Sequence, residues 1–216
     1  MLQDNLNKSI GAPYTILNHI HNVEYDPITD IVVEIGSENG EGSSVWLYNW
    51  AKQLNMEFYS IDVEHRLREK TYPEINWVVA SSGSDWCKDV LPSLNKKIKV
   101  LYLDNFDYMY EDTHPEFLYI YKEQVKSYAN RGIIMNNQNS MEEHRLQTKY
   151  CLPYMAEQSV ILMDDTYYNP QLQSQDPSEL KNWYGKCATA LPLMIEAGFS
   201  IIRNEEHNIN YAIRSR

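Results

Sequence analysis

The chain has 216 residues, enough for one domain of ordinary size. Hydrophobic residues make up 43% and charged residues 23%, a balance typical of a folded chain rather than a disordered one. The net charge of −11 argues against nucleic acid or an anionic membrane surface as the main partner, because binding to phosphate groups needs a basic surface.

The cysteines and the N-terminus predict a cytoplasmic protein. Cys87, Cys151 and Cys187 are odd in number and far apart, so neither a disulfide framework nor a cysteine-type zinc site is expected. The first residues are polar and lack the apolar centre of a signal peptide. No apolar run approaches the ~20 residues that span a bilayer. We therefore expect no membrane partner.

Short apolar segments alternate with helical ones along the chain. Five near-continuous apolar runs predict strands buried on both faces of a parallel sheet: residues 31–35, 58–61, 77–80, 99–103 and 160–163. Apolar spacing and end signals predict helices over residues 43–54, 115–131, 140–156 and 186–197. Ser140 and Glu143 have the spacing of a capping box. Residues 199–202 and 210–213 predict a closing hairpin.

This order predicts an α/β fold with crossover connections. We expect a doubly wound, mostly parallel seven-stranded sheet with a C-terminal antiparallel hairpin, of the Rossmann-like type. A flavodoxin-like or dinucleotide-binding domain is the alternative. Residues 1–216 are expected to form one domain, with a helical extension over about 1–29 and a lid-like insertion over about 105–139.

A glycine-rich loop follows the first predicted strand. Three of the eight glycines lie within seven residues there: Gly36, Gly40 and Gly42. In such sheets ligands bind at this end of the strands, and glycine lets the backbone approach them closely. Ser43 is placed to cap the next helix. Two loop carboxylates, Glu38 and Glu41, disfavour a diphosphate and favour a cationic ligand such as S-adenosylmethionine.

From Glu34 the loop reads E-x-G-x-x-x-G-x-G, which resembles motif I of class I S-adenosylmethionine-dependent methyltransferases. The dinucleotide fingerprint G-x-G-x-x-G fits less well, since its third position is Val45. The resemblance implies that the methyl donor is held by this loop, through Glu34, Gly36, Ser37, Gly40, Gly42 and Ser43.

Side chains after the second and third strands are expected to complete the donor site. Asp62 ends the second strand, where a carboxylate can accept hydrogen bonds from a ribose diol. A solvated aspartate at the strand end is the alternative. After the third strand, polar and aromatic groups fall near the expected adenine position: Ser81, Ser84, Asp85 and Trp86. A turn followed by a helix cap is the other interpretation of that segment.

Acidic residues follow the fourth and fifth strands. Asp104, Asp164 and Asp165 are delivered to the same edge of the predicted sheet. Carboxylates brought together repel one another unless they are protonated or neutralised by a cation. Oxygen ligands suit a hard divalent ion, so the sequence predicts a magnesium site. The alternative is that some of these acids only cap helices or bind water.

Residues 78–81, 91–94 and 103–106 resemble catechol O-methyltransferase and its metal-dependent relatives. The resemblance implies that Asp104, Asp164 and Asp165 are metal ligands, and Asp104 also counts among the expected donor-binding residues. The catechol enzymes carry a lysine base three residues after the first aspartate, where this chain has Asp107. Catechol is therefore not the expected acceptor.

His144, beside Glu143 on a predicted helix, is the first candidate for a general base or a further metal ligand, with Asp107 as the second base candidate. A lone histidine on a helix is often structural. Lys186 is expected to contact either substrate or only the sheet edge. Residues 136–139 offer amide groups that could bind the hydroxyls of a sugar, or form a solvated loop.

Together these features predict an S-adenosylmethionine-dependent O-methyltransferase, assisted by a divalent metal, that acts on a small hydroxylated acceptor such as a sugar. A homo-oligomer is also considered, because 17 tyrosines and five tryptophans would suit an interface. The alternatives are a metal-independent methyltransferase acting on nitrogen or a carboxylate, and a non-catalytic binding module of the same fold.

Overall fold

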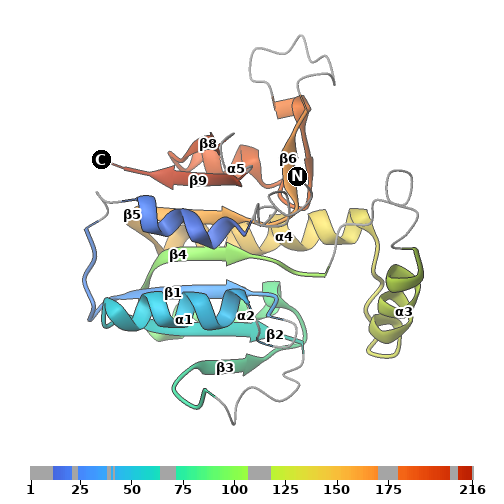
Figure 1. The fold of residues 1–216 in the computed structure, drawn as a ribbon, viewed down its shortest axis with the longest axis horizontal. Helices are drawn as coiled ribbons and strands as arrows, with labels where there is room; N and C mark the ends of the chain where they lie inside the picture. The colour runs from blue at the N-terminus through green and yellow to red at the C-terminus, as the bar shows by residue number, and fades with distance from the viewer. Residues whose placement is uncertain are drawn as a thin grey trace, which may run out of the picture.

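The computed structural model describes residues 12–20, 24–37, 40, 42–63, 72–106, 118–169, 180–204 and 209–215. In this part of the chain a seven-stranded sheet runs in the order β3-β2-β1-β4-β5-β9-β8 (Figure 1). Its strands are β1 (Asp30–Ile35), β2 (Glu57–Asp62), β3 (Asn76–Val79), β4 (Lys97–Leu103), β5 (Met155–Met163), β8 (Ser200–Asn204) and β9 (Ile209–Arg214). Strands β1 to β5 pair in parallel, and β9 pairs antiparallel with both β5 and β8. The predicted doubly wound sheet with a closing hairpin is thus confirmed.

The central strands are apolar because both of their faces are covered. Every residue of β1 is buried, and so is every residue of β4 after Lys97. Adjacent side chains of a strand point to opposite faces, and accordingly Val32 and Val33 pack in different clusters of the core. The edge strands β3 and β8 are only partly buried.

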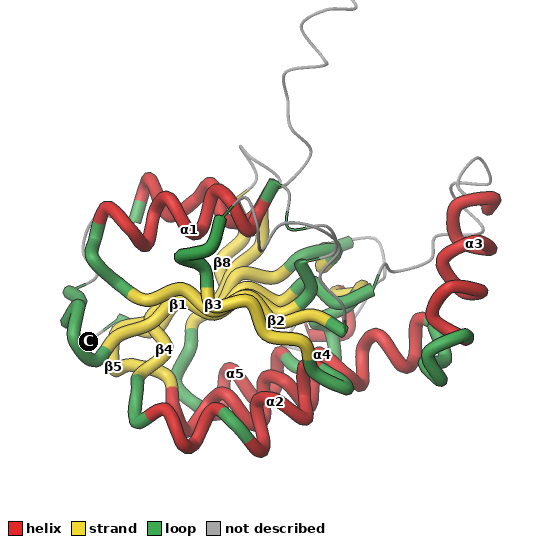
Figure 2. The backbone as a smooth tube through the Cα atoms, turned by 90° about the horizontal axis from the view of Figure 1, so that it is seen from below, coloured by secondary structure: helices red, strands yellow, loops and turns green. Residues whose placement is uncertain are grey.

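Helices cover the two faces of the sheet, as Figure 2 shows. On one face lie α1 (Ser43–Gln53) and the 3-10 helix η1 (Pro13–His19). On the other lie α2 (Gly83–Asp89), α4 (Asn137–Cys151) and α5 (Leu191–Glu196), with contacts of α2 to α4 and of α4 to α5. The described residues also form short 3-10 helices: η3 (Leu91–Leu94), η5 (Leu152–Tyr154) and η7 (Leu180–Asn182). None of the described helices combines the length and the apolar character needed to cross a bilayer.

One helix stands apart from both layers. Helix α3 (Leu118–Ala129) lies beyond the carboxyl ends of β1 and β4 in Figure 1 and precedes α4 in the chain. Helix α3 lies within residues 115–131, where the sequence predicted a helix. Part of the expected insertion, residues 107–117, lies outside the described residues, as do residues 1–11 and 21–23 of the expected N-terminal extension.

The expected helix over residues 140–156 has different ends. Helix α4 starts at Asn137, because the side chain of Asn136 accepts a hydrogen bond from the backbone N–H of Asn139 and caps the helix. No capping box forms at Ser140, which lies inside the helix. The helix ends at Cys151, just before Pro153, and β5 already begins at Met155.

The C-terminal region also corrects a prediction. Instead of one helix over residues 186–197, residues 186–190 form turns and only α5 is helical. The backbone N–H of Cys187 donates to the Thr166 hydroxyl, which directs the chain away from a helical path. The sequence did not predict the small antiparallel hairpin that holds these residues, formed by β6 (Thr166–Tyr168) and β7 (Trp183–Gly185).

The central position of β4 predicts a large loss of stability for Leu101→Ala. The Leu101 side chain is 0% exposed, and its truncation should lower the free energy of unfolding by ~2–5 kcal/mol in a urea titration. Val79→Ala on the edge strand β3, where the side chain is 60% exposed, serves as the control and should cost less than ~1 kcal/mol. Equal losses would contradict this placement of the two strands.

Candidate active site

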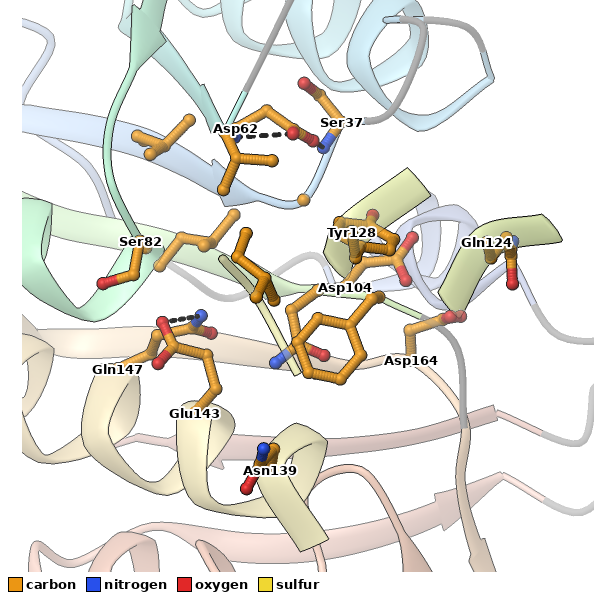
Figure 3. A pocket seen from close by; sticks show the side chains of 18 of the residues that line it. Ser37, Asp62, Ser82, Asp104, Gln124, Tyr128, Asn139, Glu143, Gln147 and Asp164 are labelled. Atoms are coloured by element: carbon orange, nitrogen blue, oxygen red, sulfur yellow. Dashed lines mark hydrogen bonds between the residues drawn. The ribbon is translucent and has the colours of Figure 1, made fainter. Parts of the chain in front are cut away.

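A cavity of about 920 Å³ opens at the carboxyl ends of the central strands. It is lined by residues that follow β1, β2, β3, β4 and β5, and by residues of η1, α3 and α4. Figure 3 shows Asp62, Asp104 and Asp164 from the strand ends, with Glu143 and Gln147 reaching in from α4 and Tyr128 from α3. The cavity therefore lies where ligands bind in doubly wound sheets.

The register of the parallel strands aligns the predicted site residues. The facing residues at these strand ends are Ile61, Ile35, Leu103 and Met163. The residues that come next form a row across the sheet edge: Asp62, Gly36, Asp104 and Asp164. Side chains that are far apart in sequence thus meet at one cavity.

Gly36 is required by a close approach of two backbones. Its φ is +93°, and a Cβ atom built there would lie 1.6 Å from the carbonyl oxygen of Asp104. The Gly36 N–H donates to the carbonyl oxygen of Ile61 at 2.8 Å, so the loop is held against its neighbouring strands. Gly40 and Gly42 also have positive φ values, +69° and +58°. The predicted glycine loop therefore has the backbone geometry that its glycines permit.

Asp62 is oriented by two backbone donors. The N–H of Ser37 donates to its Oδ2 at 2.7 Å, and the N–H of Val63 donates to its Oδ1 at 2.6 Å. Both Asp62 and Ser37 line the cavity (Figure 3). The carboxylate is held at the position expected for an acceptor of ribose hydrogen bonds.

Glu34 lies behind the glycine loop instead of in the cavity. It is fully buried, and its Oε2 accepts hydrogen bonds from the hydroxyls of Ser44 at 2.6 Å and Ser60 at 2.7 Å. Burial raises the pKa of Glu34 to about 7, although the serine hydrogen bonds act in the opposite direction. Glu34 thus ties the start of α1 to β2, while Ser43 of the same turn lines the cavity.

The segment after β3 contributes only part of the predicted set. Ser81 lines the cavity, together with Ser82 and Gly83. Among the described residues Ser84, Asp85 and Trp86 do not line it. Ser82 caps α2 by accepting from the Asp85 N–H, and the Asp85 carboxylate accepts from the Ser81 hydroxyl at 2.7 Å.

The ring of Trp86 is 2% exposed and packs in the core, with its centroid 6.2 Å from that of Tyr59. Trp86 lies on the side of α2 that faces the sheet, so its side chain packs in the core and does not reach the cavity.

Three residues of α4 line the cavity although the sequence did not predict them there: Glu142, Glu143 and Gln147. Glu143 accepts hydrogen bonds from both the N–H and the hydroxyl of Ser84, at 2.7 and 2.9 Å, and from Gln147 at 3.0 Å. Glu143 is 59 residues from Ser84 in the sequence. Local spacing could not reveal this contact and predicted instead that Glu143 belongs to a capping box of its own helix. Tyr14 of η1 is a further unpredicted lining residue, in edge-to-face contact with Tyr102.

The three predicted metal ligands surround the ammonium group of Lys186. The Lys186 Nζ lies 2.8 Å from an oxygen of Asp104, 3.2 Å from Asp165 and 3.3 Å from Asp164. These are hydrogen-bond distances, and the lysine side chain is 0% exposed. In the described part of the chain no group of histidine, cysteine and acidic residues is arranged to hold a metal ion. The carboxylates meet as predicted, but with Lys186 among them they do not fit an added magnesium ion.

The half-buried carboxylates of Asp104 and Asp164 differ in their pKa values. Burial alone would raise the pKa of Asp104, but the Lys186 charge and the hydrogen bonds from Asp164 and Lys186 outweigh it and lower that pKa. Burial and the neighbouring charge of Asp104 raise the pKa of Asp164 well above its usual range. Asp104 is therefore the ionised partner of the lysine, and Asp164 keeps a proton more readily.

His144 has a structural position instead of the predicted catalytic one. Its ring is fully buried, with Nδ1 3.2 Å from the carbonyl oxygen of Ser140 and Nε2 3.5 Å from the donating N–H of Asn105. Burial and the charge of Lys186 lower the pKa of His144 to about 3, so the ring is neutral. It joins α4 to the segment after β4. The other candidate base, Asp107, lies outside the described residues.

The wall opposite the strand ends comes largely from α3 and the start of α4. Gln124, Ser127, Tyr128 and Asn139 line the cavity here. The Asn139 amide also donates to the carbonyl oxygen of Ile134 at 2.8 Å, so part of the segment expected to bind hydroxyls stabilises its own turn.

Comparison with known proteins yields likeness in structure alone: no family model matches the chain, and no curated protein matches its sequence. MycE methyltransferase from the mycinamycin biosynthetic pathway, solved with Mg, SAH and mycinamycin VI, aligns with a TM-score of 0.53 and 13% identity over 94% of this chain and 48% of MycE. DesVI of Streptomyces venezuelae aligns with a TM-score of 0.49 and 8% identity over 100% of this chain and 95% of its own.

The chain spans about half the length of MycE. That likeness and the strand order agree: the chain has the fold of class I S-adenosylmethionine-dependent methyltransferases.

The close approach at Gly36 predicts unequal effects of two glycine substitutions. Gly36→Ala places a methyl group on the Asp104 backbone and should lower the free energy of unfolding by ~3 kcal/mol or more. Gly132→Ala has a similar φ of +77° but nothing within 4 Å of the added atom, and should cost only ~1–2 kcal/mol. Urea titration measures both, and equal losses would show that backbone strain alone, without the contact, determines the effect.

The raised pKa of Glu34 predicts that stability falls as the pH rises. An unfolded glutamate titrates near ~4.3, while the folded protein keeps the Glu34 proton up to a pH of about 7. The stabilisation is complete below the lower value, and roughly 3 kcal/mol is lost as the pH rises through the higher one. Glu34→Gln removes this titration, so its unfolding free energy relative to the wild type should increase between pH 4.5 and 8. Parallel profiles for the two proteins would contradict the assignment.

Proposed function

We propose that this chain is an S-adenosylmethionine-dependent methyltransferase that methylates a hydroxyl group of a small polar acceptor, such as a sugar or another polar metabolite. One observation carries the proposal: a single cavity is lined by the glycine loop and Asp62 on one side and by Asp104 and Asp164 on the other. The fold supports S-adenosylmethionine as the methyl donor, and the polar lining of the cavity supports a hydroxylated acceptor.

The donor half of the cavity is formed by the ends of β1, β2 and β3. The oriented carboxylate of Asp62 suits the hydroxyls of the donor ribose, and the Gly36 loop lets the backbone approach the rest of the donor. Ser81 and Ser82 offer hydroxyl groups beside it. The carboxylates of Asp62, Asp104 and Asp164 line the same cavity and favour a ligand that carries a positive sulfonium and an ammonium group.

The acceptor half lies between the ends of β4 and β5 and helix α3. The whole cavity, at about 920 Å³, is near the upper end of the range of ligand pockets, ~300–1,000 Å³. This leaves room for a small acceptor beside the donor. Gln124, Ser127 and Asn139 present amide and hydroxyl groups that suit hydroxylated molecules.

The transfer itself needs orientation and a place for one proton. The acceptor oxygen attacks the methyl carbon in line, the carbon–sulfur bond breaks, and the donor leaves as a neutral thioether. Asp164 lines the cavity, and in its ionised form its carboxylate takes up the hydroxyl proton, because burial and the neighbouring charge of Asp104 raise its pKa. Asp107 stays the alternative base predicted from the sequence. We derive no step through a metal ion, since Lys186 lies among the predicted ligands.

Calorimetry with S-adenosylmethionine tests the donor site. The wild type should bind the donor, and Asp62→Ala should weaken binding by ~10–100-fold, because hydrogen bonds to a charged group are lost. Asp89→Ala, at the exposed end of α2, is the matched control and should bind like the wild type. Absence of binding to the wild type would overturn the proposal.

A labelled methyl donor and a panel of acceptors test the second half of the proposal. Label in hydroxylated compounds is the expected result. Transfer only to amines or carboxylates would replace the proposed acceptor class, and donor binding without any transfer would favour the alternative of a non-catalytic module.

A further inference from the structure

The environment of Lys186 resembles that of a bound cation. Among the described residues its Nζ has these oxygen neighbours: Asp104 Oδ1 at 2.8 Å, the carbonyl oxygen of Asn105 at 3.1 Å, Asp165 Oδ2 at 3.2 Å and Asp164 Oδ2 at 3.3 Å. The side chain has no exposed surface. These oxygens come from the ends of β4 and β5, where the sequence predicted that a divalent ion would bind.

The backbone around Lys186 holds it in this position. Gly185 has a φ of +95°, and a Cβ atom there would lie 1.9 Å from the carbonyl oxygen of Asp165. The Lys186 N–H donates to that same carbonyl at 2.9 Å, and Gly185 pairs with Thr166 in the β6–β7 hairpin. The hairpin therefore fixes the lysine beside the turn that carries Asp164 and Asp165.

In this cluster the ammonium of Lys186 and the three carboxylates stabilise one another. A buried ammonium is unfavourable without charged partners, and neighbouring carboxylates repel one another without a cation. Magnesium needs oxygen ligands at ~2.0–2.1 Å in near-octahedral geometry. An ion at this point would have to displace a lysine that is completely buried.

We propose that the ammonium group of Lys186 is the permanent cation of the site and takes the place of a divalent metal. It holds Asp104, Asp164 and Asp165 in position, so methyl transfer proceeds without a metal ion. This inference rests on the proposed function. Lys186 is a positioning residue, since it acts through Asp104 and Asp164, which line the cavity, whereas Lys186 does not line it in the described part of the chain.

Titration of the wild type with Mn²⁺, followed by calorimetry and by the melting temperature, gives the first test. We expect no binding and no change in melting temperature relative to a buffer with chelator. Mn²⁺ binding that is abolished by Asp164→Asn would overturn the inference. This test needs neither the acceptor nor any activity.

Removal of the lysine gives the converse test. Lys186→Ala leaves three carboxylates without their cation, so the variant should melt lower in chelator, bind Mn²⁺ at least about tenfold more tightly than the wild type, and be stabilised by it. Lys186→Arg keeps the charge and should show no such gain. A folded Lys186→Ala variant that ignores Mn²⁺ would overturn the inference, and if the variant does not fold, the titration of the wild type decides.

Lys99→Ala is the matched control for the loss of a buried lysine. Lys99 is 3% exposed, and its Nζ lies 3.9 Å from one carboxylate, that of Asp30. This variant should also lose stability but gain no affinity for Mn²⁺. A similar gain in both variants would show that the effect does not come from the Lys186 cluster.

Donor binding and methyl transfer in chelator separate this inference from the proposed function. Both should be unchanged within about twofold between chelator and Mg²⁺. If the donor binds but transfer requires Mg²⁺, the inference about Lys186 is wrong and the methyltransferase proposal stands. If the donor binds in neither buffer, the proposed function is wrong.

Discussion

The parallel pairing of β1 with β2 and β4 is the constraint on which the site depends. This register places Gly36 between Asp62 and Asp104 and brings backbones so close that a side chain at Gly36 would collide with Asp104. Because β1 is buried on both faces, a slip by one residue would turn its apolar side chains to the wrong layers. The apolar core thus maintains the order of polar groups at the sheet edge.

Charged side chains around the cavity link separate elements of the described structure. Lys186 joins the β6–β7 hairpin to the ends of β4 and β5, and Glu143 joins α4 to the first turn of α2. Each bond spans a large distance in sequence and satisfies a polar group that burial would otherwise penalise. The same contacts that stabilise the fold therefore shape the wall of the cavity.

Much of the fold and part of the site could be predicted. Continuous apolar runs identified the buried strands, and the glycine spacing located the loop beside Asp62, because both signals are local. Trp86 and His144 were misplaced, since a residue type alone does not show which way a helix turns its side chain. Both helices direct these rings into the interior, where burial leaves His144 neutral and bound to backbone groups.

The sequence by itself determined the strand segments, the glycine loop and the gathering of Asp104, Asp164 and Asp165 at one edge, because apolar runs and the strand ends of a parallel sheet carry this information. Only the tertiary structure decided which cation neutralises those carboxylates. Lys186 is 82 residues from Asp104, and no local pattern links the two. The hairpin that brings them together is set by close backbone packing at Gly185, which is visible only once the chain is folded.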